Sequence, residues 1–243
     1  MKYSIAIYFL LFITYSIAGW IMEVTCKSIE AKKFINRGFL IGPYCPIYGC
    51  GAVAITILLH RYTNDWIVLF FMSMIACGIL EYATSYVMEK LFHARWWDYS
   101  RRKYNINGRI CLETLIPFGI LGLLIMYVTN PFILKYLTRL PQNNLNIIAG
   151  VLFTIFMLDS IISLKVVSNV RVVGTKLSKE NGTMDNTEEM TAKVKEILLG
   201  KSILNRRLIH AYPNLQATLK KRKEEIKRKT EAVKEEIKKK TSK

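Results

Sequence analysis

The stretch WIVLFFMSMIACGILEYATSYVMEKLF, residues 66–92, is a long apolar run that carries two carboxylates, Glu81 and Glu89, in its second half. A helix needs roughly 20 apolar residues to cross about 30 Å of hydrocarbon, so this run is long enough to span a membrane. Four further runs lie at residues 4–24, 39–60, 110–128 and 145–167. Together with 51% hydrophobic residues, they predict an all-α integral membrane protein with five transmembrane helices in 243 residues.

Lysine and arginine are unevenly distributed between the loops that these runs imply. They follow the first run (Lys27, Lys32, Lys33, Arg37), the third (Arg95, Arg101, Arg102, Lys103, Arg109) and the fifth, whereas the other side carries only Lys2, Arg61, Lys135 and Arg139. Short basic loops stay in the cytoplasm. We therefore expect a multi-pass protein of the cell membrane with its N-terminus outside and its C-terminus in the cytoplasm.

The first run has a second interpretation, as a signal peptide cleaved before Gly19. Ser16 and Ala18 supply the small residues of such a cleavage site. Hydrophobicity continues through Trp20, however, as a membrane span would. We favour the membrane span.

The C-terminal third differs in composition from the rest. Up to Val167 the chain has 15 basic and 8 acidic residues, and from Ser168 onward 20 and 10. We predict a transmembrane domain over 1–167 and a basic, helical cytoplasmic tail over 168–243. Two pieces of that tail carry a helical pattern: a capping pair, Asn186 with Glu189, opens an amphipathic stretch, and Glu-Glu-Ile-Lys recurs at 224–227 and 235–238.

The charge of this tail predicts its partners. Each basic residue near an anionic membrane surface contributes about 1 kcal/mol of attraction, so we expect contact with membrane lipids. No aromatic residue follows Tyr212, so no platform exists there for stacking bases, and we expect no nucleic acid partner. A solvated helix that merely obeys the positive-inside rule is the simpler interpretation.

Carboxylates recur at the predicted cytoplasmic ends of the spans: Glu23, Glu81, Glu89, Glu113 and Asp159. An ionised group inside a membrane costs roughly 2.5 to 3.5 kcal/mol by insertion scales, so each is a candidate functional residue. Spacing of four places Glu81, Ser85 and Glu89 on one helix face. The nearest cationic partners are Arg37 and Arg109, which we expect to pair with Glu23 or Glu113 or to bind a ligand.

Two segments of the membrane part resemble one another. Gly19, Trp20 and Glu23 precede Asn36-Arg37-Gly38 and Gly42-Pro43, while Gly78 and Glu81 precede Asn107-Gly108-Arg109, Pro117 and Gly119. They predict two parallel helical-hairpin repeats followed by one helix. In the first, Gly42-Pro43 and Pro46 forbid a continuous helix through residues 39–60. Residues 36–51 then line a cavity, or form a loop that ends before a short span.

The sequence carries no pattern typical of a metal site, a cofactor site or an ATPase. Five cysteines lack a paired C-x-x-C, and His60, His93 and His210 are scattered, so we predict free thiols, no metal and no cofactor. Gly200, Lys201 and Ser202 match the end of a phosphate-binding loop, but Lys195 occupies the place of its first glycine. This chain therefore has no ATPase motif, and no catalytic residue is assigned.

Several motifs carry a resemblance to a known family. They are Gly19-Trp20 with Glu23, Asn36-Arg37-Gly38-Phe39-Leu40 with Gly42-Pro43, Cys45-Pro46-Ile47-Tyr48-Gly49, Trp96-Trp97-Asp98-Tyr99-Ser100, and Asn107-Gly108-Arg109. In these the chain resembles the Gram-positive family called putative ABC-transporter type IV, whose members are usually labelled ABC transporter permeases. The resemblance covers about two thirds of the chain. It implies a membrane transport component that works with a separate ATPase subunit, and it defines no substrate.

Three functions remain open at this point. The first is a permease-like protein that binds or moves a polar or anionic substrate in a cytoplasm-facing cavity. The second is a membrane-embedded enzyme acting on lipid, with Glu81 or Asp98 as general base. The third is a membrane scaffold whose basic tail binds lipid. We favour the first and predict a substrate-binding site at Glu23, Asn36, Arg37, Glu81, Asp98, Asn107 and Arg109.

Overall fold

The computed structural model describes residues 3–180, 187–212 and 215–217, and 77% of these residues are helical. Its helices are α1 (Ile5–Ala31), α2 (Pro46–Leu58), α3 (Trp66–Phe92), α4 (Leu112–Leu124), α5 (Asn130–Leu137), α6 (Gln142–Glu180), α7 (Thr187–Lys201) and α8 (Ile203–Ala211). A 3-10 turn, His60–Tyr62, precedes α3, and a π-helical turn, Ile125–Thr129, joins α4 to α5. The described chain is thus an all-helical protein apart from four very short strands.

Within the described residues, four helices are long and apolar enough to cross a membrane: Ile5–Ala31, Trp66–Phe92, Leu112–Leu137 and Gln142–Leu177. The protein is therefore multi-pass. The second predicted span, 39–60, is not one continuous helix, because only Pro46–Leu58 is helical and Pro46 occupies its first turn. The predicted break at Gly42-Pro43 is confirmed, since residues 32–45 contain no helix.

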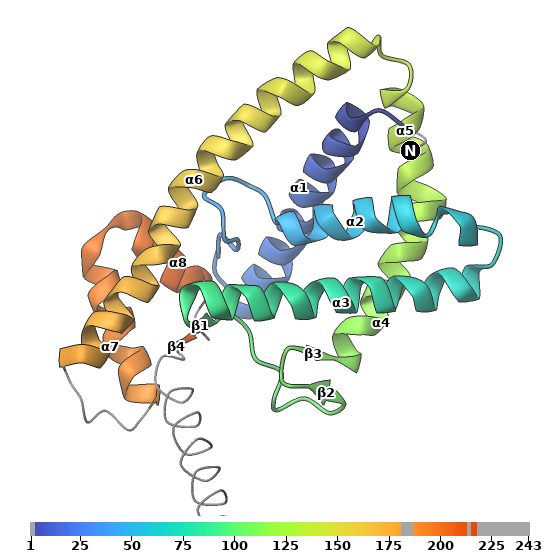
Figure 1. The fold of residues 1–243 in the computed structure, drawn as a ribbon. Coiled ribbons are helices and arrows are strands. Elements are labelled where there is room, and N and C mark those ends of the chain that lie inside the picture. Colours follow the sequence, from blue (N-terminus) through green and yellow to red (C-terminus); the bar gives the residue numbers. More distant parts are fainter. Residues whose placement is uncertain (1–2, 181–186, 213–214, 218–243) are drawn as a thin grey trace, which may run out of the picture.

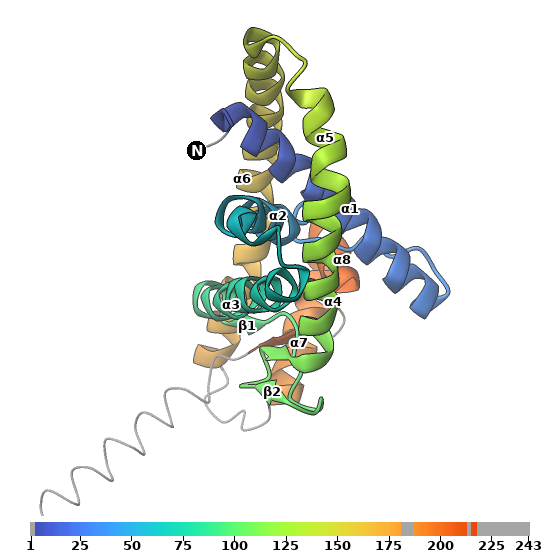
Figure 2. The same ribbon diagram turned by 90° about the vertical axis from the view of Figure 1, so that its right-hand side faces the viewer.

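The helices cross one another at steep angles (Figure 1). Helices α2 and α3 run side by side in opposite directions, and α4 and α5 pass across them. Figure 2, turned by 90°, shows α2 and α3 almost end-on while α4, α5 and α6 still run upright. α6 leads from the end of α5 back to α7 and α8, which lie against its C-terminal half.

Glycines let the helices of each hairpin approach closely. A Cβ on Gly49 of α2 would lie 2.4 Å from the Phe12 carbonyl oxygen of α1. A Cβ on Gly122 of α4 would lie 2.1 Å from the Ser73 hydroxyl oxygen of α3. Small residues at helix contacts are typical of membrane proteins, where tight van der Waals packing replaces the hydrophobic effect between helices. Both pairs, α1 with α2 and α3 with α4, use this kind of contact.

The C-terminal helices pack on the rest of the protein. Val167 and Val170 of α6 share a buried cluster with Val194 and Leu198 of α7 and with Leu208 of α8. The division predicted at 167/168 falls inside α6, which continues to Glu180. The predicted amphipathic stretch is confirmed at Val194 and Leu198, which are fully buried. Asn186, the predicted cap, and the Glu-Glu-Ile-Lys segments lie outside the described residues.

Two small antiparallel ladders hold the loops. β1 (Ala94–Arg95) pairs with β4 (Gln216–Ala217), so the chain after α8 is joined to the end of α3. β2 (Asn105–Ile106) pairs with β3 (Ile110–Cys111) in a hairpin that leads into α4. Asn107 and Gly108 form its turn with positive φ angles of 54° and 66°. The Asn-Gly pair suits this turn because both residues tolerate the left-handed region.

Candidate functional site

A cavity of about 170 Å³ lies where helices α1 to α4 meet the loops that follow α1 and α3. Much of its wall is apolar, with side chains such as Ile55, Leu80 and Leu121. Its polar wall is made of two acids, one arginine and three tyrosines: Glu23, Glu81, Arg37, Tyr48, Tyr99 and Tyr212. Three of the seven predicted site residues, Glu23, Arg37 and Glu81, therefore come together here.

Glu23 and Arg37 form one side of the cavity. The Tyr48 hydroxyl donates a hydrogen bond of 2.7 Å to one carboxylate oxygen of Glu23. Arg37 Nε lies 3.4 Å from the other oxygen, so the pairing predicted between Arg37 and Glu23 is confirmed. The Arg37 guanidinium also donates to the Ala211 carbonyl at 2.7 Å and lies 4.7 Å from the centre of the Tyr212 ring. Arg37 thereby joins this acid to the end of α8.

Glu81 forms the opposite side and is 6% exposed. It accepts hydrogen bonds from the Tyr99 hydroxyl at 3.2 Å and from the Thr114 hydroxyl at 3.4 Å. Burial, and then the charge of Glu81, raises the pKa of Tyr99, so that its hydroxyl stays protonated as a donor. Within the described part of the chain, no lysine, arginine or histidine nitrogen lies within 4.0 Å of this carboxylate.

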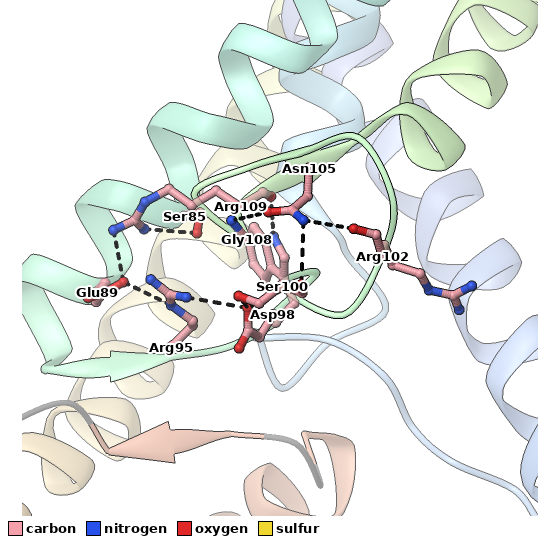
Figure 3. A network of polar contacts seen from close by, with 10 residues as sticks. Ser85, Glu89, Arg95, Asp98, Ser100, Arg102, Asn105, Gly108 and Arg109 are labelled. Carbon is pink, nitrogen blue, oxygen red and sulfur yellow. Dashed lines mark hydrogen bonds and ion pairs between the residues drawn. The ribbon is translucent and has the colours of Figure 1, made fainter. Parts of the chain in front are cut away.

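Arg109 belongs to a separate network outside the cavity (Figure 3). It is 8% exposed and donates to Glu89 at 2.9 Å and to the Ser85 hydroxyl at 3.1 Å. Arg95 approaches the same Glu89 oxygen at 3.3 Å and Asp98 at 3.3 Å. Figure 3 shows Glu89 between the two arginines. Of the acids named as partners for the two arginines, neither Glu23 nor Glu113 contacts Arg109, which pairs with Glu89 instead.

Glu113 lies at the exposed start of α4, where Arg102 contacts it at 2.9 Å. The hairpin from β2 to β3 turns the Arg109 side chain toward α3 and away from α4, which explains this exchange of partners.

The loop motifs after α3 hold each other in place. The Tyr99 backbone N–H donates to the Gly108 carbonyl at 2.8 Å, and the Trp97 indole donates to the Arg109 carbonyl at 3.1 Å. Asp98 accepts from the Ser100 backbone and hydroxyl at 3.0 and 2.6 Å. Burial opposes the charge of Asp98, but these bonds and Arg95 outweigh it and lower the Asp98 pKa. This contact network positions Tyr99 and Trp97 on the cavity wall.

The two predicted asparagines bind aromatic side chains instead of lining the cavity. Asn36 accepts a hydrogen bond of 3.1 Å from the Trp20 indole. Asn107 donates to the Tyr82 hydroxyl at 2.9 Å. Each tethers a loop to the preceding helix, in the first and second hairpin respectively.

Asp159 contacts the broken segment before α2. Its carboxylate accepts from the backbone N–H groups of Ile41 at 3.0 Å and Gly42 at 2.7 Å, and the Ser163 hydroxyl donates to it at 2.8 Å. Backbone groups at membrane depth must find a partner within the protein. Asp159, singled out in the sequence only as an intramembrane acid, supplies that partner.

Arg207 of α8 binds the same segment from the other side. Its guanidinium donates to the carbonyls of Gly38, at 3.4 Å, and Leu40. With Tyr212, it is a part of the site that sequence reasoning missed, because both lie in a stretch read as a separate basic tail. Tyr48 and Tyr99 were also missed as cavity residues, although both lie in the motifs that carried the family resemblance.

The structure also places the cysteines and the Gly200-Lys201-Ser202 sequence. All five cysteines are free thiols. Among the described residues, no group of three or more histidine, cysteine, aspartate or glutamate side chains could hold a metal ion. Lys201 binds Asn169 at 3.1 Å, and the Ser202 hydroxyl caps α8 by accepting from the Asn205 N–H. The Gly200-Lys201-Ser202 sequence thus marks a junction between two helices.

Comparison with models of known protein families identifies the family of this chain. The model of the family described as Putative ABC-transporter type IV matches residues 10–164. The chain belongs to this family. The matched part holds seven of the eight charged and aromatic residues that line the cavity, whereas the eighth, Tyr212, lies beyond it. The seven are Glu23, Arg37, Tyr48, Glu81, Trp97, Tyr99 and Phe118. Neither the curated proteins nor the solved structures contain a match.

Proposed function

We propose that this chain is the permease-like subunit of an ABC-type transporter and binds a polar substrate in the cavity between its two hairpins. The observation that carries the proposal is the meeting of Glu23, Arg37 and Glu81, from separate helices and a loop, around one cavity. Intramembrane ionisable residues that face a cavity are typical of substrate pathways. The remaining predicted residues, Asn36, Asp98, Asn107 and Arg109, act by holding the two loops that close this cavity.

The membrane arrangement belongs to the same proposal. Helices α1–α2 and α3–α4 are two parallel hairpin repeats, and α6 is the additional helix. Each repeat has a glycine contact, an acid on its first helix and an arginine in the following loop. α2, with the broken segment before it, makes the fifth crossing. Residues 1–167 then form the membrane domain, and 168–243 lie on the cytoplasmic side.

The direction of insertion can be tested with reporter fusions. A fluorescent protein fused after Lys243 is expected to be active in the cytoplasm, and alkaline phosphatase at the same point inactive. The matched control is a fusion after Arg61, between α2 and α3, where we expect the opposite result. Phosphatase activity at the C-terminus would reverse the orientation and place the loops after α1 and α3 outside the cell.

A separate ATPase partner is the direct test of the transport role. The full-length chain, tagged and purified in mild detergent from the cell membrane of its natural host, is expected to bring down a subunit with a complete Walker motif. The Glu81→Gln variant should keep that subunit but lose substrate-stimulated ATP hydrolysis, because Glu81 lies in the cavity. Absence of any nucleotide-binding subunit from the purified complex contradicts the proposal.

Glu81→Gln and a C-terminal truncation distinguish the permease from a lipid enzyme and from a scaffold. A lipid enzyme would show a changed lipid profile on Glu81→Gln. A scaffold would lose its function when residues 218–243 are removed. We choose this truncation because a cut after Val172 would also remove α7 and α8, which share a buried cluster with α6. A permease keeps its ATPase partner after the shorter truncation.

A further inference from the structure

Hydrogen bonding leaves the Glu81 side of the cavity rich in acceptors and poor in donors. The Tyr48 hydroxyl is used on Glu23 and the Tyr99 hydroxyl on Glu81. Arg37 directs Nε to Glu23 and an Nη1 donor to the Ala211 carbonyl, and it makes no ion pair with Glu81. Beside Glu81, the groups that remain for a ligand are carboxylate lone pairs and aromatic faces. A ligand complementary to this side of the cavity must therefore donate hydrogen bonds.

The charges of the cavity wall also favour a ligand that donates hydrogen bonds and carries a positive charge. With both acids ionised, the lining carries two negative charges and one positive charge, and Arg37 already pairs with Glu23. Glu81 is 6% exposed and has only two hydroxyl donors, at 3.2 and 3.4 Å. A buried carboxylate is costly unless a cation accompanies it. An anionic ligand would add to this cost, whereas a cationic ligand would supply the missing counter-charge.

The shape and the walls define the rest of the ligand. At about 170 Å³, the cavity is smaller than the sites of drug-sized molecules. Its aliphatic walls suit a compact apolar body, and the rings of Tyr99 and Trp97 can face a cation. Because most of the lining is apolar, a cation that carries an apolar body fits the cavity better than a hydrated inorganic ion.

We propose that the cavity binds a small organic cation, with a primary ammonium group at Glu81 and a short apolar body against the aliphatic wall. This inference rests on the proposed function, since it names the substrate class of the same cavity. The substrate expected from the sequence was polar or anionic; the cation replaces the anionic option, because Arg37 already pairs with Glu23 while Glu81 contacts only hydroxyl groups.

Three probes of one shape and different charge test this inference on the full chain in lipid nanodiscs. They are phenethylammonium, neutral 2-phenylethanol and anionic 3-phenylpropanoate, with dissociation constants measured by calorimetry. We expect phenethylammonium to bind at least about tenfold more tightly than either of the others, since one fully desolvated charge pair is worth that factor or more. Equal affinities, or tightest binding of the anion, overturn the inference.

Two substitutions test whether the ammonium group binds at Glu81. Glu81→Gln is expected to weaken phenethylammonium binding at least about tenfold, while leaving 2-phenylethanol unaffected. The matched control is Glu113→Gln, the same change at an exposed acid outside the cavity, which should change nothing. If Glu81→Gln does not fold, the comparison of the three probes on the unaltered chain still tests whether the cavity prefers a cation. An ATPase subunit that copurifies while phenethylammonium shows no preference refutes the cation and leaves the transport role intact.

Discussion

Asp159→Ala is expected to lower the thermal unfolding midpoint of the detergent-solubilised protein by about 5 °C or more. The substitution removes the carboxylate that accepts from the Ile41 and Gly42 backbone N–H groups at 3.0 and 2.7 Å. The Ile41 N–H keeps the Ser163 hydroxyl oxygen as an acceptor at 3.1 Å, whereas the Gly42 N–H is left unpaired. One unpaired donor costs about 1 to 3 kcal/mol, and we expect a loss of that size. The broken segment before α2 would lose its contact with α6.

Two variants control this prediction. Asp159→Asn keeps one acceptor oxygen and should be intermediate. Asp65→Ala removes an exposed aspartate that caps α3 through the Ile67 and Val68 N–H groups, and it should cost only about 1 kcal/mol. Midpoints are measured by size-exclusion chromatography after heating. If Asp159→Ala unfolds no earlier than Asp65→Ala, Asp159 does not hold the segment, and lipid or water satisfies those N–H groups.

Some features of the site could be read from the sequence because they depend on short-range rules. Apolar run length located the four helices that are long enough to span a membrane, and Gly42-Pro43 located the break before α2. A spacing of four correctly placed Glu81, Ser85 and Glu89 on one face, since the first two are buried and the third binds Arg109. Each of these depends on helix geometry over a few residues.

Other features depend on contacts between distant parts of the chain. Asp159 lies 118 residues from Ile41, which it binds, and no local pattern indicates that pairing. Arg109 is equally compatible with Glu89 and Glu113 by sequence, and only the turn of the β2–β3 hairpin chooses between them. The approach of Arg37 to Ala211 spans 174 residues.

The tail illustrates a different limit. Its charge suggested a solvated unit, because a basic composition predicts a cytoplasmic location but does not distinguish a free helix from a packed one. The decisive signal was apolar: Val194 and Leu198, four residues apart, share a buried cluster with Val167 and Val170 of α6. Packing brings Tyr212 to the cavity wall, so the cavity includes a residue from beyond the family match.

Gly49→Ala is expected to destabilise the first hairpin and disturb the cavity together. The new Cβ would lie 2.4 Å from the Phe12 carbonyl oxygen and 2.3 Å from the Ser16 hydroxyl oxygen. The Ser16 side chain could rotate away from the new Cβ. The Phe12 oxygen belongs to the backbone and cannot, so α1 and α2 must separate. Overpacking of this kind costs about 1 to 3 kcal/mol, occasionally more. Since α2 also carries Tyr48, the shift would lengthen its 2.7 Å bond to Glu23.

The matched control is Gly150→Ala, the same substitution in helix α6, where a Cβ would meet nothing within 4 Å. There the only effect is helix propensity, which should stabilise the protein by about 0.5 to 1 kcal/mol. The two variants should therefore shift the unfolding midpoint in opposite directions. Gly49→Ala should also weaken phenethylammonium binding, and Gly150→Ala should not. Equal midpoints for the two variants would mean that α1 and α2 do not touch at Gly49.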